Sequence, residues 1–292
     1  MSPHRGRTGL WLVPAAALGL AAAAVGWARY VEPRRLELVE WEVPLERLEP
    51  AAVSTILHLS DLHVGRLGFG AQEFVRALGP AALSARVLCL TGDFCDRSSE
   101  VPLVEAFLTP LLHAMAVHGG GAVQAYAVWG NHDRRAGQAA LAVVLRRLGV
   151  AVLDNTAVRL PQGLWLAGVG DPTTRQDRLD QALAGIPAGD PFVLLAHNPA
   201  IFPRAAAAGV PLTLAGHTHG GQVRVGHWDG MVGKVSLAEP YRQAGWFRLG
   251  AQAMYVNRGL GMTFLPLRFN ARPEATLFHL VPQVPRTEAA TT

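Results

Sequence analysis

The clearest sign of the fold is the stretch Val87-Leu88-Cys89-Leu90-Thr91-Gly92-Asp93, in which four apolar residues lead into a short turn and a carboxylate. A continuous apolar run is typical of a central strand that is covered on both faces. The residue that follows such a strand lies at the carboxyl edge of the sheet, where open α/β sheets bind ligands. Gly92 permits the tight turn that this position needs. We therefore expect Asp93 to belong to a binding site at a sheet edge.

Four further segments place the same kind of side chain after an apolar run. They are Ser60-Asp61-Leu62-His63, Gly130-Asn131-His132-Asp133, Ala196-His197-Asn198-Pro199 and Gly216-His217-Thr218-His219. Asp, Asn and His can all bind metals, and their recurrence after successive strands predicts a multinuclear metal site assembled from loops. Each segment alone has a simpler interpretation, since Asn131 or Asp133 by itself is typical of a helix N-cap. The prediction depends on all five occurring together.

Strand-like and helical stretches alternate in the first half of the chain. Apolar runs at 53–59, 87–90 and 123–129 are followed by helical patterns at 71–83, 101–117 and 134–148. This alternation predicts a layered α/β domain. An alternating stretch at 36–43 suits an edge strand with one buried face, so we expect the domain to begin there.

Short strands prevail after residue 150. They are expected at 150–153, 157–160, 164–169, 192–196, 212–215, 222–225, 247–249, 253–256 and 275–280. So many strands with few helices predict a second sheet. We therefore predict the α/β class, as a four-layer α-β-β-α sandwich of two mixed sheets over residues 31–282, with a disordered tail at 283–292.

The amino-terminal segment is different in kind. Residues 9–28 carry no charge and are flanked by arginines, and 20 such residues are about the length that crosses a bilayer. The run is longer than the apolar core of a signal peptide, which favours an uncleaved anchor over residues 1–30, although 22–24 could form a cleavage site. We predict a single-pass helix in the inner membrane. Arginines on both flanks leave open which side of the membrane the globular domain faces.

The composition excludes several classes of protein. A chain of 292 residues with 50% hydrophobic content can bury one sizeable core. The net charge is +4 and the pI about 9.6, but the basic residues are scattered, which argues against nucleic-acid binding. Cys89 and Cys95 have no CxxC spacing, so neither a disulfide framework nor a thiolate zinc site is expected.

In this order the five segments resemble the calcineurin-like metallophosphoesterase superfamily, whose pattern is D-x-H, G-D-x-x-D, G-N-H-D/E, H and G-H-x-H. The similarity spans residues 55–222, with every element present. The resemblance implies that one metal is held by Asp61, His63 and His219, and that the other is held by Asn131, His197 and His217. It also implies that Asp93 bridges the two, and a carboxylate is the side chain best able to share two cations.

The same resemblance implies a mechanism. Two divalent ions, of which manganese, iron or zinc suit mixed nitrogen and oxygen ligands, would supply a bridging hydroxide that attacks the phosphorus atom. His132 is then the proton donor to the phosphoryl or leaving-group oxygen, and Asp133 orients its imidazole. Asp96 is expected to accept a hydrogen bond near the site rather than to bind metal.

The anchor and the late segments around Arg258-Gly259-Leu260-Gly261 and Pro266-Leu267-Arg268-Phe269 resemble the membrane-associated bacterial branch of the superfamily. The expected substrate is a phosphodiester or pyrophosphate, and because an anchor places the site near a bilayer, a lipid-linked one is a reasonable class. The side chains of Met262, Phe264 and Leu265 either contact an acyl chain or pack internally. One alternative is the UDP-2,3-diacylglucosamine pyrophosphate hydrolase of lipid A synthesis. Another is a non-catalytic metal-binding module of the same fold. The sequence does not predict an oligomeric state.

Overall fold

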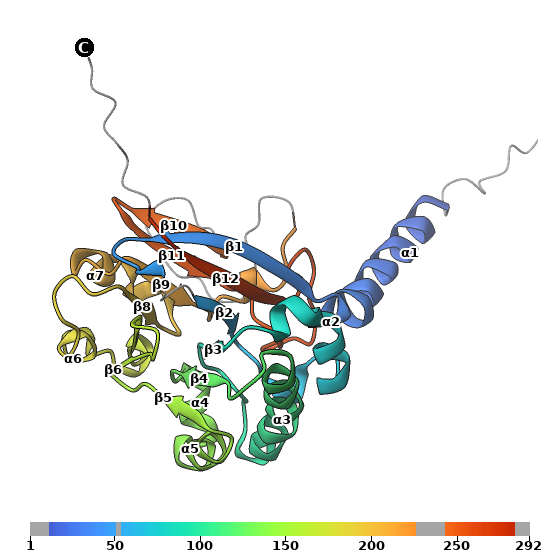
Figure 1. Ribbon diagram of the computed structural model, residues 1–292. Helices are drawn as coiled ribbons and strands as arrows, with labels where there is room; N and C mark the ends of the chain where they lie inside the picture. The colour runs from blue at the N-terminus through green and yellow to red at the C-terminus, as the bar shows by residue number, and fades with distance from the viewer. Residues whose placement is uncertain (1–11, 51–53, 226–242, 284–292) are drawn as a thin grey trace, which may run out of the picture.

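The structure is a computed structural model that describes residues 12–50, 54–225 and 243–283. Two six-stranded sheets pack face to face (Figure 1). The first has the order β1 (Glu37–Leu45), β12 (Glu274–Pro282), β2 (Ser54–Leu59), β3 (Val87–Leu90), β4 (Gln124–Ala127) and β5 (Val150–Val152). Its strands are parallel except where β12 meets β2, so the sheet is mixed.

The second sheet has the order β10 (Gly245–Leu249), β11 (Gln252–Val256), β9 (Leu212–Ala215), β8 (Phe192–Leu195), β7 (Trp165–Gly168) and β6 (Thr156–Arg159). Its central strands are parallel, and its edge strands β10 and β6 are antiparallel to their neighbours. Both sheets are therefore mixed, as predicted.

Helices cover the outer faces of both sheets. The first sheet is covered by α2 (Ala71–Leu83), α3 (Val101–His118) and α5 (Gln138–Arg147), and the second by α6 (Leu179–Leu183) and α7 (Phe202–Ala207). In Figure 1, α6 and α7 lie at the left, on the other side of the sheets from α2 and α3. The four-layer prediction is confirmed. The short helical turns are η2 (Trp27–Val31), η3 (Glu32–Arg34), η5 (Val64–Arg66), η6 (Ser98–Glu100), η7 (Pro172–Thr174), η8 (Pro199–Ile201) and η9 (His219–Gly221).

Strand β3 shows why its sequence is apolar at every position. Leu88 and Leu90 belong to the core under the helices, whereas Val87 and Cys89 belong to the core between the two sheets. All four side chains are buried because alternate residues face opposite layers. Cys89 is a small core residue, as expected, and Cys95 is also buried as a free thiol.

Three local predictions differ from the structure. The sheets do not divide at residue 150, because β5 and β12 pair within the first sheet. The predicted strand at 222–225 is reduced to isolated bridge residues, of which Val223 pairs with Phe269. The predicted helix at 134–148 is two helices, α4 (Asn131–Ala136) and α5, because Gly137 has a φ of 105°, which a regular helix cannot contain.

The amino-terminal helix α1 (Leu12–Gly26) extends from the body of the protein (Figure 1). Its residues 16–25 are exposed, whereas Ala28 and Glu32, just beyond it, are buried against the globular part. Within the described part of the chain, one helical stretch, Ser98–His118, is long and apolar enough to cross a membrane. That stretch packs one face into the core of the first sheet. The anchor over residues 1–30 stays a prediction, and most of the predicted tail lies outside the described residues.

Candidate metal centre

The five predicted segments meet at the carboxyl ends of the parallel strands. Asp61 follows β2, Asp93 follows β3, and Asn131 begins α4 after β4 in the first sheet. His197 follows β8 and His217 follows β9 in the second sheet. Because the two sheets pack face to face, their carboxyl edges bring these loops together. The predicted site residues are therefore assembled from both sheets.

One group of ligand atoms comes from Asp61, His63 and His219, which lie within 4.8 Å of one another. His219 Nε2 is 3.4 Å from Asp61 Oδ1. Asp61 Oδ1 and His63 Nε2 are buried and have no hydrogen-bond partner among the described residues. Buried polar atoms without partners are rare in proteins, and two that share one position fit a bound cation.

A second group comes from Asp93, His197 and His217. His217 Nδ1 lies 3.1 Å from His197 Nε2, and Asn131 Oδ1 lies 3.1 Å from the same nitrogen. His197 Nδ1 is 2.8 Å from the carbonyl oxygen of Thr91, which leaves Nε2 to face the group. Ring nitrogens and an amide oxygen that converge in this way again fit a divalent ion.

Asp93 lies between the two groups. Its Oδ2 is 3.5 Å from His63 Nε2 in the first group and 3.3 Å from His197 Nε2 in the second. Its Oδ1 accepts a hydrogen bond of 2.8 Å from the backbone N–H of His132. One carboxylate oxygen thus faces both groups, the geometry expected of a ligand shared by two cations.

The backbone at the site is strained. Five of the seven predicted ligands have positive φ angles: Asp61 (48°), His63 (36°), Asp93 (55°), His217 (73°) and His219 (52°). Residues other than glycine adopt this region at a cost of about 1–3 kcal/mol each, and such residues cluster at functional sites. Neighbouring glycines allow the close approach, since a Cβ on Gly130 or Gly216 would collide with the carboxylate of Asp93 or Asp61.

Asp96 supports the histidines from behind. Its Oδ1 is 2.9 Å from His63 Nδ1 and 2.7 Å from His132 Nδ1. These contacts fix both rings so that each Nε2 is left for other partners. Asp96 therefore accepts hydrogen bonds at the site, as the sequence analysis expected of it.

The predicted role of Asp133 is wrong. Its carboxylate accepts hydrogen bonds from the backbone N–H groups of Asp93, Phe94 and Gly130, at 2.9, 2.7 and 2.8 Å. The carboxylate that contacts the ring of His132 is that of Asp96. Because α4 begins at Asn131, Asp133 lies in its first turn and points back toward the loop after β3. Asp133 fixes the backbone at Asp93, Phe94 and Gly130.

Charges within the site shift the pKa values of its members. Burial would raise the pKa of Asp61 and Asp93, but neighbouring histidines hold both below their usual range, His219 for Asp61 and His197 for Asp93. Burial would lower the pKa of His63 and His197, but contacts with Asp96 and Asp93 raise it. Burial lowers the pKa of His219 to about 3. The carboxylates are thus ionised and His219 is neutral, the forms that bind a metal, whereas the raised pKa values of His63 and His197 favour their protonated forms when no metal is bound.

The sequence analysis did not assign a role to Arg268, which is fully buried. Its guanidinium donates hydrogen bonds to the carbonyl oxygens of Arg258, Gly259, Gly261 and Ala271. The carbonyl of Gly261 also lies 3.3 Å from Nδ1 of His219, a predicted ligand. In the sequence, Arg268 appeared only as part of the segment 266–269. The contacts of its side chain depend on tertiary structure, so the sequence alone did not indicate them.

His58 is buried, with its Nε2 2.9 Å from Thr91 Oγ1. Met262, predicted either to contact an acyl chain or to pack internally, is buried. Phe264 and Leu265 are exposed.

A family model for calcineurin-like phosphoesterases matches residues 54–221, more than half of the chain. The chain belongs to this family. Metallophosphoesterase YkoQ of Bacillus subtilis is 29% identical over 235 residues, which cover 77% of this chain and 83% of that protein. Phosphodiesterase YaeI of Escherichia coli K12 is 30% identical over 282 residues, 93% and 98% of the two chains. A Bos taurus transmembrane protein with metallophosphoesterase domain is 30% identical over 277 residues, 87% of this chain and 59% of that protein.

Family membership and the geometry agree on the chemistry. Calcineurin-like phosphoesterases bind divalent metals, and this member brings three groups of possible ligands together at one sheet edge, the third formed by His63, Asp96 and His132. The protein is therefore a metal-dependent phosphoester hydrolase.

Proposed function

We propose that the protein is a membrane-anchored phosphodiesterase or pyrophosphatase that uses two divalent ions. The observation that carries this proposal is the position of Asp93 Oδ2 between His63 and His197. A single ion would need only one of the two groups, and a shared carboxylate between them is the arrangement of two-metal sites. Asp61, His63 and His219 would hold one ion, Asn131, His197 and His217 the other.

When bound, two such ions polarise the phosphoryl oxygen and lower the pKa of water. The protein residues then have separate tasks. Asp96 holds Nδ1 of His132, so that Nε2 is the atom left to donate a proton to the leaving oxygen. The side chain of His132 is 14% exposed, whereas the side chain of His63 is completely buried, so His132 is the one that a substrate can reach.

A phosphodiester is favoured over a monoester because the E. coli relative is named as a phosphodiesterase. A hydrolysis panel with Mn²⁺ tests this. We expect an aryl phosphodiester or UDP-2,3-diacylglucosamine to be cleaved faster than an aryl monoester. Faster cleavage of the monoester would overturn the substrate class.

A variant pair tests the role of His132. His132→Ala should lower kcat by about 10²–10⁴-fold, the usual contribution of a positioned acid or base. His113→Ala on α3, a matched substitution outside both ligand groups, should leave kcat unchanged. Equal activity of the two variants would exclude His132 as the proton donor.

The anchoring is supported by the exposed, uncharged residues 16–25 of α1 and by the name of the bovine relative as a transmembrane protein. Full-length protein should stay with membranes after alkaline extraction, whereas a Leu18→Arg, Leu20→Arg double variant should be released. A reporter fused after Thr292 would give the side of the membrane. Release of the unaltered protein would refute the anchor without affecting the hydrolase assignment.

A further inference from the structure

The loop after β11 presents apolar side chains to solvent beside the metal centre. Phe264 is 72% exposed and Leu265 is 41% exposed, whereas Leu260 and Met262 in the same loop are buried. Phe264 also has a φ of 52°, which an aromatic residue adopts only when its surroundings impose it. Adjacent apolar side chains that are held in solvent in this way are typical of an interaction site.

The loop is held in place by two polar side chains. Gln222 Nε2 donates to the carbonyl oxygens of Thr263 and Leu265, at 2.9 and 2.8 Å, and Gln222 Oε1 accepts from the N–H of Thr263. Arg66 Nη1 donates to the carbonyl oxygen of Phe264 at 3.0 Å. The exposure of Phe264 is therefore fixed by hydrogen bonds on both sides of it.

The same two side chains connect the loop to the metal centre. Gln222 directly follows the turn that contains the ligand His219. Arg66 lies in the turn after His63, and its Nε is 3.7 Å from Oδ2 of Asp96. Phe264 and Leu265 thus lie at the rim of the site.

The loop also contacts the end of the amino-terminal helix. The N–H of Arg268 donates to the carbonyl oxygen of Ala28 at 2.9 Å, and the N–H of Ala271 donates to Glu32 Oε1 at 2.7 Å. Figure 1 shows the red and orange loop beside the base of α1. Any surface that the exposed part of α1 enters would therefore lie close to the rim.

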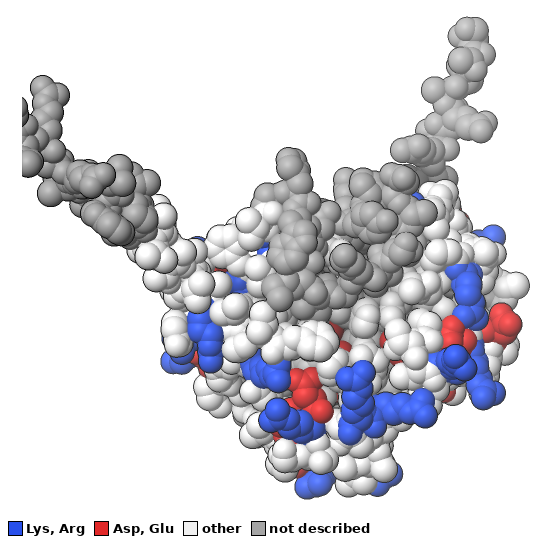
Figure 2. Space-filling model, turned by 180° about the vertical axis from the view of Figure 1, so that it is seen from behind, with Lys and Arg blue, Asp and Glu red and all other residues white. Residues whose placement is uncertain are grey.

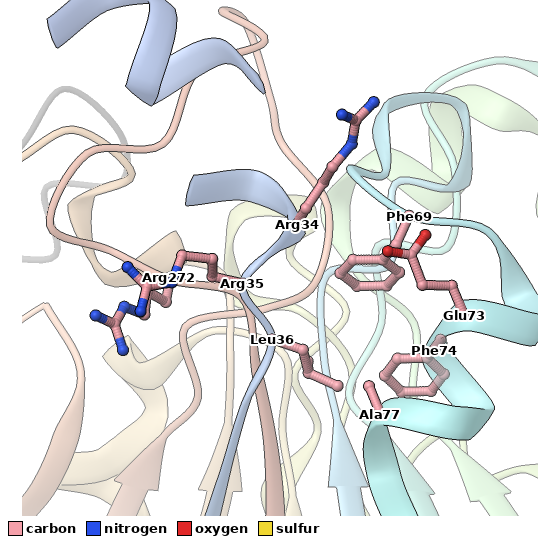
Figure 3. Close-up of a pocket in the computed structure, with 8 residues that line it drawn as sticks. All are labelled: Arg34, Arg35, Leu36, Phe69, Glu73, Phe74, Ala77 and Arg272. Atoms are coloured by element: carbon pink, nitrogen blue, oxygen red, sulfur yellow. The ribbon is translucent and has the colours of Figure 1, made fainter. Parts of the chain in front are cut away.

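A small cationic slot adjoins the same region (Figure 3). It is a cavity of about 230 Å³ with Arg34, Arg35 and Arg272 among its lining residues. The apolar part of its lining is formed by Leu36, Phe69, Phe74 and Ala77, with Glu73 as the one acidic group. Figure 3 shows Arg35 and Arg272 side by side, across Leu36 from the two phenylalanine rings. Cations beside an apolar patch complement an anionic lipid head group.

We propose that Phe264, Leu265 and the arginine slot form one docking surface for an anionic phospholipid bilayer. The metal centre then opens at the membrane surface, where a phosphoester carried by a lipid can enter from the side. Figure 2 shows basic side chains below the end of α1 and in separate groups elsewhere, so the overall charge alone would not select this face. The selection comes from apolar and cationic groups occurring together beside α1. The inference rests on the proposed anchoring.

The two native cysteines make a direct test possible. Cys89 and Cys95 are both buried, so a single surface cysteine can be labelled selectively. Full-length Phe264→Cys would carry an environment-sensitive fluorophore in nanodiscs of phosphatidylglycerol and phosphatidylethanolamine. We expect nitroxide-labelled lipids to quench this probe and its emission to shift to the blue. The matched control is Val117→Cys on α3, also exposed, which should not be quenched.

A third label separates failure of the docking from failure of the anchor. A probe at Leu20→Cys on α1 should be quenched if the helix is in the bilayer. Quenching at 20 without quenching at 264 would overturn the docking surface and leave the anchor intact. A blue shift at 264 in detergent that depends on protein concentration would assign the surface to a second copy of the chain and also overturn the proposal.

The charged part of the surface has its own test. The reference is the labelled Phe264→Cys protein in anionic nanodiscs. Its quenching at 264 should weaken when the lipid is zwitterionic, and also when Arg272→Gln is added in anionic nanodiscs. Equal quenching in all three would remove the arginine slot from the proposal. Arg147→Gln on α5 is the matched control, since it changes an exposed arginine outside the slot.

Discussion

The two ligand groups of the metal centre differ in how far they are closed off from solvent. Asp61, His63 and His219 are all buried, whereas His217 and Asn131 in the second group are partly exposed. Both groups are backed by protein contacts, from Asp96 behind His63 and Gly261 behind His219 in the first and from Thr91 behind His197 in the second, so burial is what separates them. The closed group is built to retain an ion, and the open group lies where a substrate can arrive. We expect the two ions to bind with unequal affinity, the first more tightly.

The largest expected effect comes from removing the residue that both groups share. Asp93→Ala leaves His63 and His197 without the carboxylate that both face. Loss of one partner of a buried charged pair costs about 3–5 kcal/mol, about a hundredfold to several thousandfold in metal affinity. Metal content measured by mass spectrometry should fall for both ions. His217→Ala should lose the second ion alone, and retention of both ions by Asp93→Ala would refute the bridging role.

Two nearby carboxylates have different roles. Asp96 orients histidine rings, whereas Asp133 holds the backbone. Asp96→Asn weakens the contacts to His63 and His132, and changes of this kind usually cost about 10–100-fold in activity or metal affinity. Asp133→Asn should instead lower the free energy of unfolding by about 1–3 kcal/mol, because one backbone N–H loses its acceptor. Hydrolysis rates and thermal unfolding of both variants check this. A larger activity loss for Asp133→Asn, with no loss of stability, would restore its predicted role in catalysis.

Metal affinity and the stability of the metal-free protein should change with pH in opposite directions. In metal-free protein the carboxylates raise the pKa of His63 and His197, so protons occupy nitrogens that a metal needs. Metal affinity should rise with pH, by about tenfold per unit for each proton released, until the raised pKa is passed. The raised pKa also stabilises the metal-free fold at low pH, and this contribution is lost as the pH rises through it. Calorimetric titration and thermal unfolding at several pH values would measure both trends. Metal affinity that is independent of pH would contradict the assignment of these histidines.

Much of the fold and of the site was predictable because it depends on local pattern. The run 87–90 is apolar at each position since both its faces are covered, and the position of Asp93 follows from where that strand ends. The ligands lie after strands for the same reason. In both cases the sequence pattern reports the burial of residues that are close in the chain.

The failures have a common physical cause, which is that the decisive contacts join residues far apart in the chain. Asp133 was paired with its neighbour His132, yet its carboxylate reaches Asp93 and Phe94, some 40 residues away. Asp96 contacts His132 across a similar distance. Strand β12 enters the first sheet between β1 and β2, which no local pattern could indicate. The break at Gly137 was a local signal, a glycine within a helical pattern, that the prediction did not use.

Arg268 is expected to have the smallest effect of the residues discussed, a modest change in the affinity of the first group for its ion. Its guanidinium holds the carbonyl of Gly261, which contacts the first-group ligand His219 and has no hydrogen bond to the second group among the described residues. Arg268→Lys keeps the charge but cannot reach all four carbonyl oxygens. The loss of one hydrogen bond costs about 0.5–1.5 kcal/mol, which weakens the binding of the first ion about two- to tenfold. The affinity of the second ion should not change, and Arg147→Lys, an exposed control, should change neither. Equal weakening of both ions would mean that Arg268 stabilises the whole rim instead of the closed group, and the two affinities would then have to differ because of burial alone.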